Sequence, residues 1–134
     1  MTSEPAGAGG QGIIREPAVA GFFYPGEPDK LRTEVEECLR WRPPDQAGVE
    51  PERPAPAAAL IVPHAGYLYS GPVAGATYAS ARLPATLVIL GPNHTGAGEP
   101  IAVMHRGAWR TPLGSVRINE ALADRILETC SPAS

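Results

Sequence analysis

The strongest structural pattern in the chain lies in residues 58–96, AALIVPHAGYLYSGPVAGATYASARLPATLVILGPNHTG. Two apolar runs stand near its ends: AALIV at 58–62, which Pro63 ends, and TLVIL at 86–90, which Gly91 ends. Short, continuous apolar runs bounded by Pro or Gly are typical of strands buried on both faces. We therefore expect both runs to be buried strands.

Between these two runs the sequence favours a helix. Ser70, Gly71 and Pro72 provide a plausible start, and VAGATYASARL continues with small and apolar residues on neighbouring turns. A strand, a helix and a second strand in this order make the strands parallel, with a right-handed crossover. The predicted fold class is α/β, with a parallel or mixed sheet flanked by helices.

The segments on either side add further elements. Apolar residues at helical spacing predict a helix from Pro28 to Trp41, whereas residues 43–56 lack periodicity and indicate a surface connection. IAVM at 101–104 and SVRI at 115–118 are weaker strand candidates, and Asn119 is a plausible N-cap for a last helix. Residues 1–12, mostly small residues with little to bury, are expected to be a disordered tail before a single domain at 13–134.

Composition excludes several classes of protein. The chain has 134 residues, with 11 basic and 14 acidic side chains and a net charge of −3, and without a basic cluster it offers no surface for nucleic acid or anionic lipid. The two cysteines, Cys38 and Cys130, have no zinc-knuckle or disulfide-framework spacing. No apolar stretch approaches a signal peptide or a membrane span, so we expect a soluble cytoplasmic protein.

Two histidines are the main candidates for chemistry. His64 follows the first apolar run, and His94 lies in the turn after the second. Loops at the carboxyl ends of parallel strands are neighbours, and ligands bind in the crevice beyond them, so the two imidazoles could share a metal ion. A complete site needs at least one more ligand. The alternative is that each histidine only forms hydrogen bonds within its loop.

Other polar residues have weaker claims. Tyr67 and Tyr69 could line a cleft or donate hydrogen bonds to a ligand, although a tyrosine beside a strand end is at least as often a packing residue. Arg110 could orient an anionic substrate, although a loop arginine is usually solvated. His105 is interpreted as a solvent-facing turn residue. The Gly-rich GPNHTGAG lacks the lysine of a phosphate-binding loop, which disfavours nucleotide binding.

Four motifs occur together and in order: AVAGFFYPG at 18–26, IVPHAGYLYSG at 61–71, ILGPNHTG at 89–96 and WRTPLG at 109–114. This set resembles the Memo-like protein family, which includes AmmeMemoRadiSam system protein B. The resemblance runs from about Ile13 into the last helix and covers the N-terminal part of such proteins. It implies a fold similar to the class III extradiol dioxygenases, which we expect to be truncated in this chain.

The resemblance also implies a non-haem metal site. By the family pattern His64 and His94 are metal ligands, with iron as the expected metal and copper or zinc as alternatives. The remaining family site residues, an Asp, a His and a Cys among them, belong to the later part of such proteins, and neither Cys38 nor Cys130 occupies the position of the site cysteine.

Three hypotheses about function stay open. The first is a metal-dependent enzyme of the oxidoreductase type, in which the ion polarises a substrate oxygen. The second is a non-catalytic scaffold that recognises a peptide or protein partner through the same crevice. The third is an inactive fragment with uncovered apolar surface. The identity of the small-molecule or protein ligand and the oligomeric state do not follow from the sequence.

Overall fold

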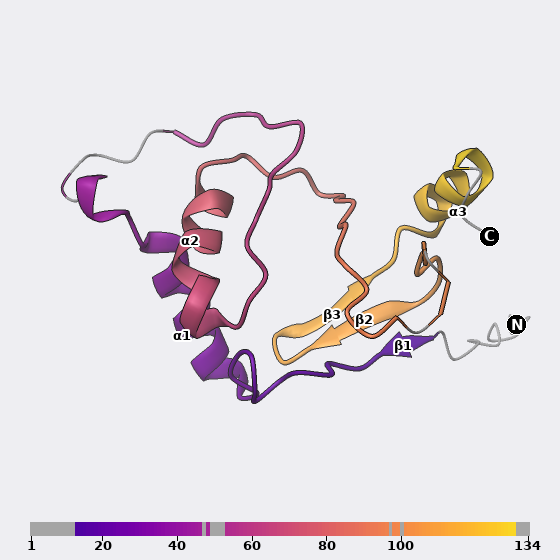
Figure 1. Ribbon diagram of the computed structural model, residues 1–134, viewed down its shortest axis with the longest axis horizontal. Helices are drawn as coiled ribbons and strands as arrows, with labels where there is room; N and C mark the ends of the chain where they lie inside the picture. Colours follow the sequence, from indigo (N-terminus) through magenta and orange to yellow (C-terminus); the bar gives the residue numbers. More distant parts are fainter. Residues whose placement is uncertain (1–12, 47, 49–52, 97, 100, 131–134) are drawn as a thin grey trace, which may run out of the picture. The chain divides into compact units, whose positions relative to one another are not determined.

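The computed structural model describes residues 13–46, 48, 53–96, 98–99 and 101–130. Its helices and its small sheet confirm the predicted α/β class (Figure 1). The predicted tail, residues 1–12, lies outside the described residues. None of the helices described is both long and apolar enough to cross a bilayer. The elements in chain order are β1 (Ile14–Arg15), α1 (Pro28–Arg40), a 3-10 turn (Pro44–Gln46), α2 (Tyr67–Ala79), β2 (Ala108–Thr111), β3 (Gly114–Arg117) and α3 (Glu120–Thr129).

Contacts between residues divide the chain into two compact units. Unit 2 consists of Pro17–Pro92 with Thr111–Gly114, and so contains α1 and α2. Unit 1 contains β1, the segment Asn93–Arg110 and the chain from Ser115 onward. Each unit is described by itself below.

Helix α1 follows the prediction for residues 28–41. Pro28 occupies the first turn, where a missing N–H costs nothing, and Asp29 places a negative charge at the positive end of the helix dipole. Leu31 is the buried residue of the helix. The helix ends at Arg40 because Trp41 adopts an extended conformation before Pro43 and Pro44.

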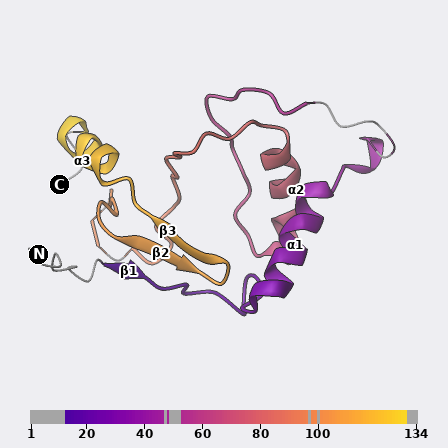
Figure 2. The same ribbon diagram turned by 180° about the vertical axis from the view of Figure 1, so that it is seen from behind.

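The core of unit 2 is the contact between α1 and α2, which lie side by side (Figures 1 and 2). Gly71 and Gly75 of α2 are buried against Cys38 of α1. A Cβ atom at Gly75 would lie 2.8 Å from the Cys38 Cβ and still closer to the Cys38 carbonyl group. The absence of side chains at these two glycines therefore lets the backbones approach closely.

Helix α2 begins at Tyr67, three residues before the predicted start at Ser70, and Pro72 lies inside it. The first turn is held from outside the helix, because the Tyr67 N–H donates to the Phe23 carbonyl (2.8 Å). The Ser70 hydroxyl also donates to the Ala65 carbonyl (3.0 Å). These contacts extend the helix ahead of a proline that the sequence suggested as its start.

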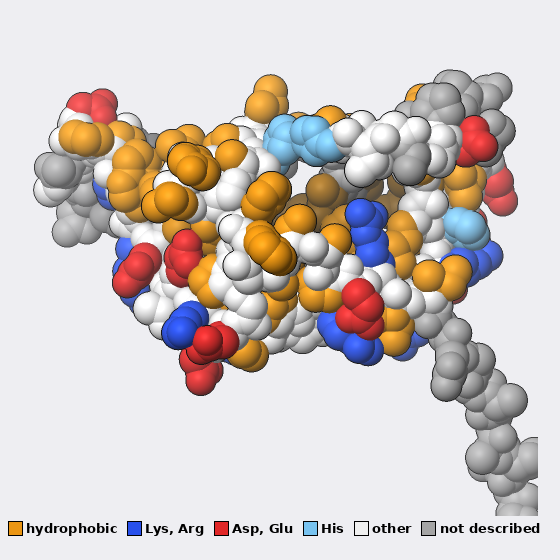
Figure 3. Space-filling model, turned by 60° about the horizontal axis from the view of Figure 1, so that its bottom comes forward, with side chains coloured by type: hydrophobic (Ala, Val, Ile, Leu, Met, Phe, Trp, Pro, Cys, Tyr) orange, Lys and Arg blue, Asp and Glu red, His pale blue; other side chains and the backbone are white. Residues whose placement is uncertain are grey.

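The two apolar runs at 58–62 and 86–90 are not strands in the structure, and the prediction that they are buried strands is wrong for this chain. Neither run is assigned to a strand or a helix. Their side chains are largely exposed: Ile61 by 97%, Ile89 by 72% and Leu90 by 91%. The face drawn in Figure 3 carries many hydrophobic side chains at its surface. A run suited to a sheet interior becomes a strand only when a second backbone pairs with it.

One bridge does link the flanks of these runs. Ala55 pairs in parallel with Ala81, since the Ala55 N–H donates to the Ser80 carbonyl (3.0 Å) and the Arg82 N–H donates to the Ala55 carbonyl (2.8 Å). The chain is therefore parallel at this bridge, which joins Ala55, before the first run, to Ala81, after the end of α2.

The sheet has the order β1-β2-β3. β1 runs parallel to β2, with Ile14 opposite Ala108 and Arg15 opposite Trp109, and the two-residue turn at Pro112 and Leu113 returns the chain along β3. The sheet is therefore mixed. β3 agrees with the strand predicted at 115–118, whereas the strand predicted at 101–104 is not formed.

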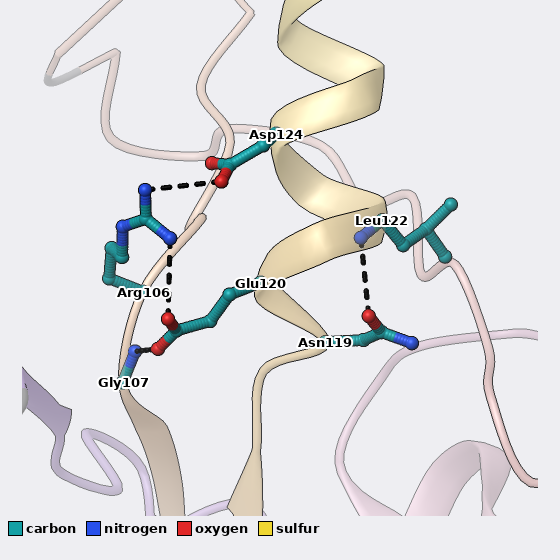
Figure 4. Close-up of polar contacts among 6 residues, drawn as sticks. All are labelled: Arg106, Gly107, Asn119, Glu120, Leu122 and Asp124. Atoms are coloured by element: carbon teal, nitrogen blue, oxygen red, sulfur yellow. Dashed lines mark hydrogen bonds and ion pairs between the residues drawn. The ribbon is translucent and has the colours of Figure 1, made fainter.

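Helix α3 confirms Asn119 as its N-cap, because the Asn119 side chain accepts from the Leu122 N–H at 3.2 Å (Figure 4). Glu120 accepts from the Gly107 N–H (3.2 Å) and pairs with Arg106, which also reaches Asp124 (3.1 Å). The Gly107 hydrogen bond, followed by the Arg106 contact, lowers the pKa of Glu120. These contacts tie the start of α3 to the segment before β2.

Candidate functional site

His64 lies in unit 2, where it lines a groove of about 250 Å³ formed by α1, α2 and the segment 62–65. The side chain of His64 is exposed. Most of the groove wall is apolar, and the wall is formed by Val35, Cys38, Leu39, Val62, Pro63, His64, Ala65, Tyr67, Ser70, Gly71, Ala74, Gly75 and Tyr78.

The segment that carries His64 is anchored at its far end. The Ser70 hydroxyl donates a hydrogen bond to the Ala65 carbonyl. Gly66 packs against the backbone of Phe23, and a Cβ added at Gly66 would lie 3.3 Å from the Phe23 carbonyl oxygen. The Tyr67 N–H then donates to the same oxygen. His64 is thus fixed to the start of α2 through the residues that follow it.

Two groups in the groove that ionise as acids stay uncharged at neutral pH. Burial, followed by the charges of Glu34 and Glu37, raises the pKa of the Cys38 thiol. Burial also raises the pKa of Tyr67, with a further contribution from the charge of Cys38. The Tyr67 ring packs against Tyr24 at 5.8 Å between centroids. The groove therefore offers a neutral thiol and a phenol able to donate a hydrogen bond.

His94 lies in unit 1, in a turn organised by Asn93. The Asn93 side-chain oxygen accepts from the Thr95 N–H (3.2 Å), the Thr95 hydroxyl (3.0 Å) and the Gly96 N–H (3.0 Å). Gly96 has a φ of 66°, which suits glycine. The three hydrogen bonds enclose His94, so the side chain of Asn93 fixes the backbone on both sides of the imidazole.

The remaining predicted site residues are dispersed. Tyr67 lines the same groove as His64. Tyr69, two residues further along α2, is 81% exposed and is not part of the groove wall. Arg110 lies on β2 in unit 1, where it pairs with Glu16 at 2.9 Å. That ion pair is exposed, and solvent weakens it. His105 is exposed, as predicted.

A metal ion needs a complete set of donor atoms around it. Two imidazoles are suitable ligands for iron, copper or zinc, but they make an incomplete set. Among the residues described, no group of three or more His, Cys, Asp or Glu side chains is arranged to hold a metal. The chemistry of an imidazole suits such a metal, but His64 and His94 alone would leave its ligand set incomplete.

Sequence reasoning missed two residues that shape the site. Asn93, before His94 and two residues before Thr95 in a Gly-rich loop, carries the signal of an Asx turn. Ser70 was interpreted as a helix start, and its hydrogen bond to Ala65 has no sequence signature. Cys38 also lines the groove, but its position there depends on how α1 packs on α2, which the sequence does not show.

Comparison with protein-family models gives one family. The model described as "Memo-like protein" matches residues 15–133, which is nearly the whole chain. This range includes both histidine turns, the groove and all three helices.

Curated proteins agree with this result. A MEMO1 family protein of Methanopyrus kandleri is 48% identical over 120 residues, which cover 87% of this chain and 42% of the relative. MEMO1 family proteins of Methanocaldococcus jannaschii (45% identical, 87% and 42% covered) and Aquifex aeolicus (43% identical, 86% and 40% covered) are similar in the same way. The chain thus spans about two fifths of the length of these relatives.

Proposed function

The chain belongs to the Memo-like protein family, and on this premise we propose that it supplies two ligands, His64 and His94, to a non-haem metal site in a cytoplasmic protein of the oxidoreductase type. Iron is the proposed metal, with copper or zinc as alternatives. A fold similar to the class III extradiol dioxygenases is part of the proposal.

The proposal rests on one observation: beside each histidine, a side chain forms hydrogen bonds with backbone groups of the turn that contains the histidine. The Ser70 hydroxyl donates to the carbonyl of Ala65, the residue after His64. The Asn93 side-chain oxygen accepts from the N–H groups of Thr95 and Gly96, the two residues after His94. Fixed ligands lose little conformational entropy on binding, which favours metal affinity. A loop histidine without a ligand role does not need a turn ordered in this way, and here both histidine turns are ordered.

The chain's own residues would hold the metal and orient what binds beside it. When bound, the metal supplies a Lewis acid. The phenol of Tyr67 is protonated at neutral pH, and burial raises its pKa further, so Tyr67 would donate a hydrogen bond to a substrate oxygen in the groove beside His64. Tyr69 and Arg110 are weaker candidates for contacts with a small-molecule or protein ligand. We propose no contact with nucleic acid or membrane.

Histidine side-chain NMR during anaerobic titration with Fe²⁺ tests the proposal. Because bound Fe²⁺ broadens nearby signals, His64 and His94 should broaden over the same concentration range. His64→Ala and His94→Ala should each weaken binding by roughly tenfold or more, since even changes at supporting residues cost tenfold or more. His105→Ala is the matched control and should leave the titration unchanged.

Two results would contradict the proposal: unchanged affinity in both alanine variants, or broadening of the two imidazoles at separate concentrations, which indicates separate sites. In either case the partner-binding scaffold and the inactive fragment become the better hypotheses. The scaffold would then predict capture of a defined partner that is weakened by Tyr67→Ala.

A further inference from the structure

The sulfur of Met104 is in contact with a hydrogen-bond donor. Met104 lies in unit 1, before β2, and its side chain is half-buried, which leaves it open to a small dissolved oxidant. The indole N–H of Trp109, on β2, donates a hydrogen bond to this sulfur. A thioether is a weak acceptor, whereas its oxidation product, the sulfoxide, is polar and carries an oxygen on the sulfur. Oxidation of Met104 would therefore alter its contact with Trp109.

The indole of Trp109 also contacts β1. Arg15 lies opposite Trp109 where β1 pairs with β2 (Figure 1), and the Arg15 guanidinium lies over the indole ring, 5.1 Å from the ring centroid. A cation in this position is attracted to the face of the ring. β1 has only two residues, and so short a strand depends on side-chain contacts as well as on its pairing. The position of the indole therefore affects how firmly β1 is held.

The chain between Met104 and β2 is fixed from another side. Arg106 pairs with both Glu120 and Asp124 of α3 (Figure 4). The Gly107 N–H donates to the Glu120 carboxylate. These contacts restrict movement of the backbone that follows Met104. An oxygen added to the sulfur on the side of the indole must therefore be accommodated mainly by displacement of the indole itself.

We propose that Met104 is a site of reversible oxidation by peroxide, and that Trp109 transmits this oxidation to the pairing of β1 with β2. A lone pair of the Met104 sulfur attacks one peroxide oxygen, so that an S–O bond forms while the O–O bond breaks. The sulfur loses two electrons, and the leaving hydroxide takes the proton of the transferred oxygen to become water. Methionine sulfoxide reductases reverse the change, one enzyme for each epimer. The proposal is independent of the metal site.

The test treats the full chain with hydrogen peroxide in EDTA, and dithiothreitol then reduces reversibly oxidised cysteines. Peptide mass spectrometry should show one added oxygen on Met104. The Ala108 amide, which donates to the Ile13 carbonyl of the β1 side, should then exchange roughly tenfold faster, the equivalent of one lost hydrogen bond. The Ile118 amide, which donates to Gly107 on the β3 side, is the internal control and should exchange at its original rate. Treatment with both reductases should restore the Ala108 rate.

Three variants separate the steps. Met104→Leu conserves the volume but has no sulfur, so peroxide should leave Ala108 exchange unchanged. Met104→Gln places a polar group beside the indole and should speed Ala108 exchange without peroxide. Trp109→Phe keeps a ring for Arg15 but lacks the N–H donor. In this variant Met104 should be oxidised about threefold faster, the equivalent of a lost sulfur–aromatic contact, and its oxidation should no longer speed Ala108 exchange.

Four results would overturn the proposal. The first is an unmodified Met104 under conditions that oxidise N-acetylmethionine. The second is a sulfoxide at Met104 that leaves Ala108 exchange unchanged, since Trp109 would then transmit nothing. The third is equal acceleration at Ala108 and Ile118, which would indicate general loosening of unit 1. The fourth is a peroxide response that persists in Met104→Leu, which would assign the effect to another residue.

Discussion

Replacing Gly75 with alanine tests the packing that forms the core of unit 2. A Cβ at Gly75 would lie 2.8 Å from the Cβ of Cys38 and closer still to the Cys38 carbonyl, whereas real Cβ atoms essentially never approach within 3.0 Å. These obstacles are mostly backbone atoms, which cannot rotate away. The two helices must therefore move apart for the variant to fold.

The magnitude follows from two opposing effects. Overpacking costs about 1–3 kcal/mol, and a clash with the main chain belongs at the upper end of that range. Alanine gains roughly 0.5–1 kcal/mol over glycine in helix propensity. The net loss is about 2 kcal/mol, and for a folding unit of this size each kcal/mol lowers the melting temperature by roughly 4–8 °C.

Urea unfolding followed by the fluorescence of Trp41 measures this loss. Trp41 directly follows α1 in unit 2, and Trp109→Phe removes the tryptophan of unit 1. Gly71→Ala is the control, because the Cys38 sulfur, at 2.9 Å, is the one atom that its Cβ would approach too closely, and that side chain can turn away; the Tyr67 side-chain atoms at 3.5 and 3.7 Å are at ordinary contact distance. It should be within about 0.5 kcal/mol of the parent, as expected for a change without a lasting clash.

A double-mutant cycle with Cys38→Ala separates the two kinds of obstacle. Cys38→Ala should rescue any loss in Gly71→Ala by removing the sulfur, but it should leave most of the loss in Gly75→Ala, where the Cys38 backbone is the obstacle. A Gly75→Ala variant at least as stable as the parent would refute the close approach of the helices, because helix propensity would then be the only effect.

Three further changes test local contacts. Asn119→Ala should cost about 1 kcal/mol in α3 stability by urea unfolding followed with circular dichroism, while Asn119→Asp retains the cap. Folding lowers the pKa of Glu120 from its ordinary value of 4.5. The contribution of Glu120 to folding stability is therefore fully present above pH 4.5 and is lost as the pH falls through the lowered pKa. Glu120→Gln should abolish that acid dependence, and identical acid titrations would contradict the assignment. Asn93→Ala should speed amide exchange at Thr95 and Gly96 by roughly tenfold, the equivalent of a lost hydrogen bond, whereas Asn93→Asp should restore it.

Local signals in the sequence were reliable predictors of helices. The proline at the start of α1 and the cap at Asn119 act within one helical turn, so the sequence alone determines them. The start of α2 was misplaced because its first turn is held by Phe23, which is distant in sequence. The sequence could not indicate that contact.

The predicted strands at 58–62 and 86–90 were wrong for a different reason. Hydrophobic periodicity reports which environment a segment suits, whereas a strand also needs a partner whose backbone pairs with it. The runs keep the composition of interior strands and remain exposed in the described chain. The histidine positions, predicted from the same runs, therefore stay a prediction as a joint site, although the turns that carry them are well ordered by Ser70 and Asn93.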